Sequence, residues 1–475
     1  MAVETRPRSS VHDLRSYLAA LEAAGELARV SAPVALDQEI GAICYRNLLN
    51  HGPGLLFERP GGSDIPLAVD LLASRARYAL ALGTEPDRLA SEWNRRVATL
   101  LPPRIVERGA CQEHVLVGSD VDLKRLPAPI WNDLDGGPYL TLSCHVTRDP
   151  ETGARNVGVY RNQVHDRDLL GLLSAPYTHL MLQRRKAPSE PFPVAIAIGA
   201  DPVVLMTATS PVPFGTDELA VAGALREAPL DLVRCVTVPL EVPASAEIVI
   251  EGHIAPDLLV DEGPFGEFTG YYGGPTEPRQ VIRVSAITHR DRPILQQTYE
   301  GRPPHESAIL TGVPREAELM RQIALPGIKR VHVTAPGGGA LHAVVSIEKL
   351  YEGYGKSVGM AVLGTHPGRF IKQVIVVDDD VDPFDPSAVE WAVATRVQPH
   401  RDMEIINEVT GIILDPSLPR AEQSVHARTS KVIIDATRYD AKSYPPLCIP
   451  RATVQEQVDQ NWGRYGLPNG GRQPT

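Results

Sequence analysis

Cysteine is scarce in this sequence, and long hydrophobic segments are absent. The five cysteines are scattered through 475 residues without any CxxC spacing, which argues against a disulfide framework and a thiolate zinc site and favours free thiols in a reducing compartment. No segment approaches the roughly 18 consecutive apolar residues of a membrane-spanning helix, and the N-terminal stretch has no apolar signal core. We therefore expect a cytoplasmic protein without a membrane segment.

Basic residues are in the minority. The 47 lysines and arginines are outnumbered by 58 aspartates and glutamates, and the formal net charge is −11. This balance argues against a general surface for nucleic acid or for an anionic membrane, although it does not exclude a local cationic pocket. The content of hydrophobic residues (43%) and of charged residues (22%) is typical of a soluble globular protein, and the length indicates two to four domains.

Several common catalytic and binding motifs are missing. GxSxG, HExxH and the protein-kinase motifs do not occur. Gly337–Gly339 lacks the lysine of a phosphate-binding loop, and the acidic run 376–385 lacks the glycine and the closing glutamate of a calcium loop. The glycines are typical of a turn. The acidic run is typical of a strand end followed by capping aspartates before a helix that begins near Ser387.

The first part of the chain alternates between helical and strand patterns. Apolar residues at helical spacing follow Ser10, which we predict to be the N-cap of an amphipathic helix. Residues 53–60 and 65–72 are typical of buried strands, and residues 87–101 of another helix. The proline- and glycine-rich segment 123–141 marks a break.

The rest of the chain divides into two textures and a tail. From about residue 138 to 300 short β-rich runs bounded by turn residues dominate, which predicts a compact barrel or sandwich. After about residue 315 helix and strand patterns alternate again, which predicts a second α/β domain. Residues 455–475 are polar, and we expect them to be extended or dependent on a partner.

One short stretch, "DEGPFGEFTGYYG" at 261–273, poses a question of geometry. Glu262 and Glu267 are five residues apart, which fits neither one face of a helix nor one face of a strand. If the two carboxylates meet, a bent loop must bring them together, and Gly263, Pro264 and Gly266 provide the bend. A solvated acidic turn is the alternative interpretation of the same residues.

Four polar residues upstream are weak candidates when each is taken alone. Asn156 and Arg161 offer an amide oxygen and a planar cation, but an edge strand with a solvated arginine would look the same. His179 has the surroundings of a structural histidine, and Glu218 those of an acid in the first turn of a helix. Asn, His and Glu together suit Mn²⁺ or Mg²⁺, although their spacing does not show that they converge.

Taken together, these pieces resemble the UbiD family of prenylated-flavin-dependent decarboxylases. The matching stretches follow the family's order over most of the chain: "LPAPIWNDLDGGPYLT", "NVGVYR", "TH" at 178–179, "PFGTDELAVAGALR", "DEGPFGEFTGYYG", "VIVVDDDVDPFD" with "VEWAVATR", and "SKVIIDAT". The resemblance implies an α/β (α+β) protein with an N-terminal α/β domain (1–125), a central flavin-binding split β-barrel (126–312) and a C-terminal α/β oligomerisation domain (313–475). A homodimer or homohexamer is expected.

The resemblance also assigns a metal and cofactor site. Asn156, His179 and Glu218 correspond to the family's Mn²⁺ ligands, and the metal there bridges the protein to the phosphate of prenylated FMN. K⁺ is a further ion that the resemblance allows. Thr141, Arg161, Thr178 and Lys372 also correspond to positions along the cofactor, Lys372 near its phosphate.

The catalytic network of the family corresponds to three residues of this chain. Glu262, Arg161 and Glu267 form its Glu-Arg-Glu arrangement, so both carboxylates would meet one arginine beneath the reactive carbon of the cofactor. Glu267 is then expected to protonate the product, and Glu262 to position Arg161 and the cofactor. Thr178, which precedes His179, and Leu418 in "DPSLP" are the expected residues of the substrate pocket.

The resemblance implies reversible, non-oxidative decarboxylation of a small carboxylic acid. Hydroxybenzoates, other aromatic or heteroaromatic acids and α,β-unsaturated acids all remain open as substrates, and so does the physiological direction. A flavin prenyltransferase is implied as the supplier of the cofactor. Two other interpretations of the same residues are a Mn²⁺-dependent hydrolase without flavin and a non-catalytic assembly subunit.

Overall fold

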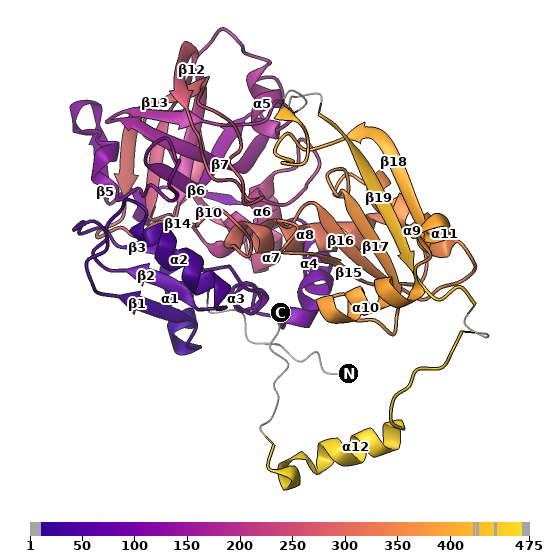
Figure 1. Ribbon diagram of the computed structural model, residues 1–475. Coiled ribbons are helices and arrows are strands. Elements are labelled where there is room, and N and C mark those ends of the chain that lie inside the picture. The colour runs from indigo at the N-terminus through magenta and orange to yellow at the C-terminus, as the bar shows by residue number, and fades with distance from the viewer. Residues whose placement is uncertain (1–10, 421–422, 424–426, 441–443, 468–475) are drawn as a thin grey trace.

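The computed structural model describes residues 11–420, 423, 427–440 and 444–467, and these residues form four β-sheets with their covering helices. Figure 1 shows three groups of elements: the N-terminal helices and strands, a barrel above them, and a separate sheet that carries the C-terminal part of the chain. Helix α8 (Glu306–Gln322) lies between the barrel and the C-terminal sheet. The N- and C-terminal α/β units therefore lie on different sides of the barrel's lower end.

The N-terminal unit is a four-stranded sheet whose last strand comes from far along the chain. The order is β1-β2-β3-β14; β14 pairs in parallel with β3, although more than 200 residues separate them. The predicted strands and helices are present. The first helix begins at Leu14, where the Asp13 side chain accepts a hydrogen bond from the Ser16 amide; Ser10 lies outside the described residues. The elements are β1 (Leu27–Val30), β2 (Gly54–Phe57), β3 (Leu67–Val69), β14 (Leu295–Gln297), α1 (Leu14–Ala23), α2 (Glu39–Leu49), α3 (Arg75–Leu82) and α4 (Leu89–Val97).

The central unit is a closed barrel. Its strands follow the order β12-β9-β6-β7-β8-β13, and β13 pairs again with β12, which closes the ring; β5 extends β13 at its end. The predicted barrel is confirmed. The strands are β5 (His114–Val117), β6 (Tyr139–Arg148), β7 (Arg155–Asp166), β8 (Leu169–Leu172), β9 (Phe192–Ile198), β12 (Ile248–Glu262) and β13 (Glu277–His289).

Several barrel strands are buried on both faces, which explains their nearly continuous apolar sequence. In β9, Ala195 and Ala197 belong to one hydrophobic core, while Val194, Ile196 and Ile198 belong to another. Successive side chains of a strand point to opposite faces, so both faces must be covered. Helices and a small sheet, in the order β11-β10-β4, accompany the barrel: α5 (His179–Arg184), α6 (Pro202–Ala208), α7 (Glu218–Arg226), β4 (Arg104–Val106), β10 (Asp231–Arg234) and β11 (Glu241–Pro243).

The C-terminal unit is a five-stranded sheet in the order β15-β16-β17-β19-β18. Asp385 caps the helix that follows the acidic run, and Gly337–Gly339 form a turn, so both predictions are confirmed. The tail was expected to be extended or dependent on a partner. Helix α12 lies apart from the body in Figure 1, so the extended alternative is wrong for its residues, and the dependence on a partner stays a prediction. The elements are β15 (Ile328–Val333), β16 (His342–Ile347), β17 (Gln373–Asp378), β18 (Met403–Thr410), β19 (Arg428–Ala436), α9 (Tyr354–Gly364), α10 (Pro386–Arg396), α11 (Pro399–Asp402) and α12 (Ala452–Gln460).

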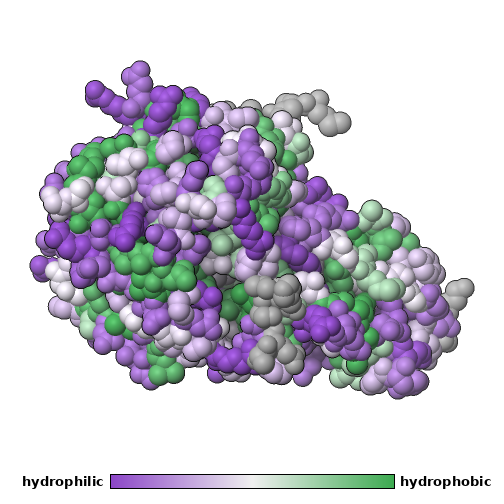
Figure 2. Space-filling model, turned by 90° about the horizontal axis from the view of Figure 1, so that it is seen from above, coloured by the Kyte–Doolittle hydropathy of each residue, from purple (hydrophilic) through white to green (hydrophobic). Residues whose placement is uncertain are grey.

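The surface seen from above has a broad lobe and a narrower one. Figure 2 shows hydrophilic and hydrophobic residues interspersed over both lobes. None of the helices in the described part of the chain combines the length and the hydrophobicity needed to cross a bilayer.

Candidate active site

Arg161 lies between the two glutamates of the 261–273 segment. Its Nε and one terminal nitrogen lie 3.0 and 3.1 Å from the two carboxylate oxygens of Glu262, so this pair is bidentate. The other terminal nitrogen of Arg161 donates to Glu267 Oε1. The Glu262 side chain is 2% exposed and the Glu267 side chain 10%, which removes the interpretation as a solvated acidic turn.

The backbone brings the two glutamates together by ending a strand and reversing. Glu262 is the last residue of β12, because the pairing of β12 with β13 continues as far as Glu262 and Glu277. From the sequence, a loop had been predicted for the whole segment. Gly263 follows with φ = 90°, a conformation that favours glycine. The chain then turns, and the Glu267 amide donates to the Tyr271 carbonyl at 2.9 Å. The bend predicted after Glu262 is therefore present.

A second set of residues fixes this arrangement, and no local sequence pattern had indicated it. Tyr139 Oη lies 3.0 Å from Glu262 Oε1 and 3.1 Å from Gln163 Oε1. Burial raises the pKa of Tyr139, and the negative charge of Glu262 raises it further, so this phenol stays protonated as a donor. The Phe265 ring lies 4.7 Å beneath the Arg161 guanidinium. Asp135 accepts the Gly266 amide at 3.0 Å and holds the loop from its other side.

Gly273 leaves room for the Glu267 side chain. A methyl group at Gly273 would lie 2.6 Å from Cγ and 2.8 Å from Oε1 of Glu267, closer than real contacts allow. At the neighbouring Gly274 the nearest atom would lie 3.6 Å away, which is ordinary contact. Neither glycine has a positive φ, so the two positions form a matched pair.

We expect Gly273→Ala to displace Glu267 and to reduce turnover at least about tenfold. A misplacement of a catalytic group by about 1 Å is enough for a loss of rate of this size or larger. Gly274→Ala is the control and should keep turnover within about twofold. Turnover is measured together with the melting temperature. Equal activity of the two variants would contradict a role for the Glu267 position.

The three predicted metal ligands lie together where β7, α5 and α7 meet. Glu218 Oε2 accepts the Val157 amide at 2.8 Å, next to Asn156, and Glu218 Oε1 lies 3.8 Å from His179 Nδ1. Asn156 Nδ2 donates to Thr147 Oγ1, which leaves its amide oxygen for another partner. Asp217 caps α7, so Glu218 opens this helix as expected of a first-turn acid but is 2% exposed.

The electrostatics of this trio suit a cation. Burial raises the pKa of Glu218, and His179 opposes that shift. A buried carboxylate next to a histidine is stabilised by a positive charge between them. The described residues contain no cluster of three or more His, Cys, Asp or Glu side chains placed for a metal. This trio is not such a cluster, because its third ligand, Asn156, is an amide. Such a mixed N/O set is compatible with Mn²⁺.

A cavity of about 670 Å³ adjoins His179, and its basic residues were not predicted. His366 and Arg369 line it from the C-terminal unit, and the Arg369 guanidinium contacts His366 Nε2. Burial lowers the pKa of both groups, and Arg369 lowers that of His366 further. No acidic side chain of the described chain pairs with Arg369. In the sequence, the only indication of a basic cluster here was the three-residue spacing of His366, Arg369 and Lys372.

The other predicted residues occupy different places. Thr141 is 5% exposed and donates to the carbonyl of Thr298 at 2.7 Å. Thr178 caps α5, and its hydroxyl donates to Ala175 O. Lys372 forms an ion pair with Asp415 at 2.9 Å.

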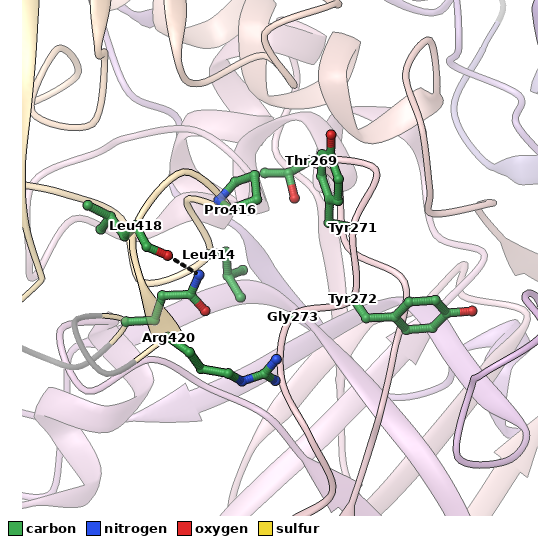
Figure 3. A pocket seen from close by; sticks show the side chains of 9 residues that line it. Thr269, Tyr271, Tyr272, Gly273, Leu414, Pro416, Leu418 and Arg420 are labelled. Atoms are coloured by element: carbon green, nitrogen blue, oxygen red, sulfur yellow. Dashed lines mark hydrogen bonds between the residues drawn. The ribbon is translucent and has the colours of Figure 1, made fainter.

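Leu418 lines a second cavity of about 320 Å³, and Thr178 is not among the residues that surround it. Figure 3 shows this cavity between residues 269–273 and residues 414–420 of the C-terminal unit. Gly273 lies against the Glu267 side chain. Lys372 fixes one wall, because its partner Asp415 also accepts the Ser417 amide. Of the two expected substrate-pocket residues, the structure thus brings Leu418 to a cavity beside the Glu-Arg-Glu cluster.

Buried polar atoms without partners lie on β6 and β14, next to Thr141. Ser143 Oγ and Gln297 Nε2, both in the described part of the chain, are buried and have no hydrogen-bond partner. Buried polar atoms are normally satisfied, so a group with its own donors and acceptors is expected between these strands. Gln297 Oε1 accepts hydrogen bonds from the Thr141 amide and from the Thr141 hydroxyl, which connects the predicted cofactor position to this set.

Three family models match this chain in sequence. They are described as the N-terminal, Rift-related and C-terminal domains of 3-octaprenyl-4-hydroxybenzoate carboxy-lyase, UbiD, and they match residues 18–97, 104–303 and 308–436. Together they cover most of the chain.

Solved structures agree with this match. The UbiD-class enzyme HmfF from Pelotomaculum thermopropionicum, in complex with FMN, is 38% identical, with a TM-score of 0.86 over 94% of this chain and 100% of that chain. An evolved dimeric form of the same enzyme, in complex with prenylated FMN (prFMN), is also 38% identical, with a TM-score of 0.82 over 92% of this chain and 97% of that chain. Vanillic acid decarboxylase from Sedimentibacter hydroxybenzoicus, in closed form, is 34% identical, with a TM-score of 0.83 over 96% of this chain and 99% of that chain.

Proposed function

Because this chain belongs to the UbiD family of carboxy-lyases, we propose that it catalyses the reversible, non-oxidative decarboxylation of an aromatic, heteroaromatic or α,β-unsaturated carboxylic acid with prenylated FMN and Mn²⁺. The observation that carries this proposal is the buried Glu262–Arg161–Glu267 cluster, whose Glu267 side chain lies against Gly273, a lining residue of the cavity of about 320 Å³. Domain limits of 1–125, 126–312 and 313–475 belong to the same proposal.

The residues that would hold the cofactor and metal fit these groups. Asn156, His179 and Glu218 supply an oxygen, a nitrogen and a carboxylate to Mn²⁺, and Arg369 offers an uncompensated positive charge to a phosphate. The unsatisfied polar atoms of Ser143 on β6 and Gln297 on β14, with Thr141 beside them, would provide partners for a flavin ring. Prenylated FMN, when bound, supplies the electron sink that holds the bonding pair left behind when CO₂ departs.

The chain's own residues then manage the proton. Both oxygens of Glu262 are engaged by Arg161 and one also by Tyr139, so Glu262 fixes the guanidinium. Glu267 receives one hydrogen bond at Oε1, and in the described chain Oε2 accepts none. Glu267 Oε2 is therefore the atom that holds a proton and delivers it to the carbon from which CO₂ has left. In the reverse direction it removes that proton.

The proposal is tested on protein co-expressed with a flavin prenyltransferase and supplied with Mn²⁺. The purified protein should carry a bound species heavier than FMN by one prenyl unit, and it should release CO₂ from at least one member of a panel of aromatic and unsaturated acids. Folded, metal-loaded protein that binds no flavin would overturn the proposal. Hydrolysis by that flavin-free protein would then indicate the Mn²⁺ hydrolase, and inactivity the assembly subunit.

Arg369 provides a separate test of the cofactor cavity. We expect Arg369→Met to weaken retention of the flavin about tenfold or more, because a charge-assisted hydrogen bond to phosphate is lost. The ratio of flavin to protein after dialysis measures this. Lys329→Met, which removes a surface ion pair with Glu348, is the control. Unchanged retention in Arg369→Met would place the phosphate elsewhere.

A further inference from the structure

The loop that carries Glu267 is joined to a distant segment by one backbone contact. Within residues 267–271 the backbone hydrogen bonds close the loop on itself, as between the Glu267 amide and the Tyr271 carbonyl. In the described part of the chain, one hydrogen bond connects the backbone of these five residues to another segment: the Phe268 carbonyl lies 2.9 Å from Nε2 of His305. Phe268 directly follows Glu267, so this bond acts next to the acid.

The two ring nitrogens of His305 have different partners. His305 is fully buried and is the N-cap of α8, where its Nδ1 accepts the Ala308 amide at 3.3 Å. An amide can only donate, so the hydrogen of the ring is on Nε2, which donates it to the Phe268 carbonyl. The Glu300 carboxylate lies 3.9 Å from Nδ1, beyond hydrogen-bond distance. Nδ1 thus caps the helix, and Nε2 holds the loop.

Two other contacts support the same loop, but neither fixes its direction. A methyl group at Gly270 would lie 2.9 Å from the Cα atom of Arg302, so the tip of the loop rests on the segment before α8. A methyl group at Gly338 would lie 2.5 Å from the Phe268 ring, so this ring packs against the turn Gly337–Gly339. Figure 1 shows α8 between the barrel and the sheet to which this turn belongs. Packing limits how closely the loop approaches, whereas a hydrogen bond also sets the orientation of the carbonyl.

The position of the Phe268 carbonyl determines where Glu267 lies. Consecutive Cα atoms are held about 3.8 Å apart by a planar peptide, so a shift of Phe268 is passed on to Glu267. Arg161 fixes Oε1 of Glu267, but the place of the Glu267 backbone is set by the loop. A catalytic group that is displaced by about 1 Å loses at least about tenfold in rate.

We propose that His305 is a positioning residue for the reaction: through the Phe268 carbonyl it holds the loop of the catalytic acid on the start of α8. His305 acts through Phe268 and takes no part in the proton transfer itself. This inference rests on the proposed function in taking Glu267 as the group that delivers the proton. Because His305 also caps α8, the test separates the roles of its two ring nitrogens.

Asparagine and glutamine each reproduce one of these nitrogens. In His305→Asn the side-chain oxygen takes the place of Nδ1, and asparagine is a good N-cap, so α8 keeps its cap while the donor to Phe268 is lost. In His305→Gln the side-chain nitrogen takes the place of Nε2, so the donor to Phe268 is kept while the cap is lost. The two variants are therefore controls for each other.

The first readout needs neither cofactor nor substrate. Hydrogen–deuterium exchange is measured on the cofactor-free protein at the Gly270 amide, which donates to the Glu267 carbonyl at 2.8 Å, and at the Ala308 amide. In His305→Asn the Gly270 amide should exchange about tenfold faster, the effect of one lost hydrogen bond, while the Ala308 amide exchanges as in the wild type. In His305→Gln the Ala308 amide should exchange faster and the Gly270 amide should not.

The second readout is CO₂ release by the cofactor-loaded enzyme. His305→Asn should lower kcat at least about tenfold at unchanged KM and flavin content, whereas His305→Gln should retain most of kcat although it melts at a lower temperature. The inference is overturned if His305→Asn keeps the wild-type kcat or the wild-type loop exchange, or if kcat follows the melting temperature in both variants, which would leave the helix cap as the only role of His305. If the wild type releases CO₂ from no acid, the proposed function fails, and the exchange at Gly270 still decides whether His305 holds the loop.

Discussion

Glu267→Gln is expected to lower kcat for CO₂ release by about 10²- to 10⁴-fold, the contribution typical of a positioned general acid. Glutamine keeps the shape of the side chain and an oxygen for the Arg161 hydrogen bond, but it has no acidic proton to give. The rate of CO₂ release is measured together with exchange of solvent deuterium into the decarboxylated product when that product is incubated with the enzyme. Both should fall, while the amount of bound flavin stays as in the wild type.

Glu277 provides the control for this experiment. It lies opposite Glu262 in the β12–β13 ladder and pairs with Arg279 at 2.5 Å at a partly exposed position. Glu277→Gln makes the same change of side chain near the same end of the β12–β13 ladder. It should change kcat by less than about twofold, because surface ion pairs contribute little. A Glu267→Gln variant that turns over like the wild type would assign the proton to another group.

Arg161→Met is expected to destabilise the protein by about 3–5 kcal/mol and to abolish measurable turnover. The substitution leaves two poorly solvated carboxylates without their shared cation, and breaking a buried ion pair from one side is strongly destabilising. The free energy of unfolding is measured by chemical denaturation of the cofactor-free protein. Stability close to that of the wild type would mean that water reaches the cluster.

The triple variant Arg161→Met, Glu262→Gln, Glu267→Gln separates stability from catalysis. Removal of all three charges should restore much of the lost stability, because no unpaired charge remains buried. It should not restore CO₂ release, since both the guanidinium and the acid are gone. A triple variant as unstable as Arg161→Met would show that packing against Phe265, and not charge, dominates at this position.

The sequence was most informative where the signal was local. The cap at Asp385, the turn at Gly337–Gly339 and the bend after Glu262 depend on neighbouring residues, and all three are present. The closed barrel could be predicted only as a choice between barrel and sandwich from strand spacing, because closure depends on the pairing of β12 with β13 and not on any one strand. The family resemblance supplied the remaining choice.

Contacts between distant segments could not be predicted. Tyr139 and Gln163 meet because they are paired across β6 and β7, and Tyr139 reaches Glu262 from 123 positions earlier in the chain. Arg369 approaches His179 only through the docking of the C-terminal unit. Neither contact has a periodic pattern or a fixed spacing in the sequence. By spacing alone Asn156, His179 and Glu218 did not converge, and the fold brings them together.

The closed barrel also has a kinetic consequence. Its hydrogen-bond ladder runs around the full ring from β12 back to β12, so among the described barrel strands none can swing outward without breaking a ladder on each side. Both cavities lie instead at the junction with the C-terminal unit. We therefore expect cofactor and acid to enter and leave when the C-terminal unit moves away from the barrel, while the barrel itself stays closed. In hydrogen–deuterium exchange, loading of the cofactor should slow exchange in residues 366–372 and 414–418 and leave the amides of β9 unchanged.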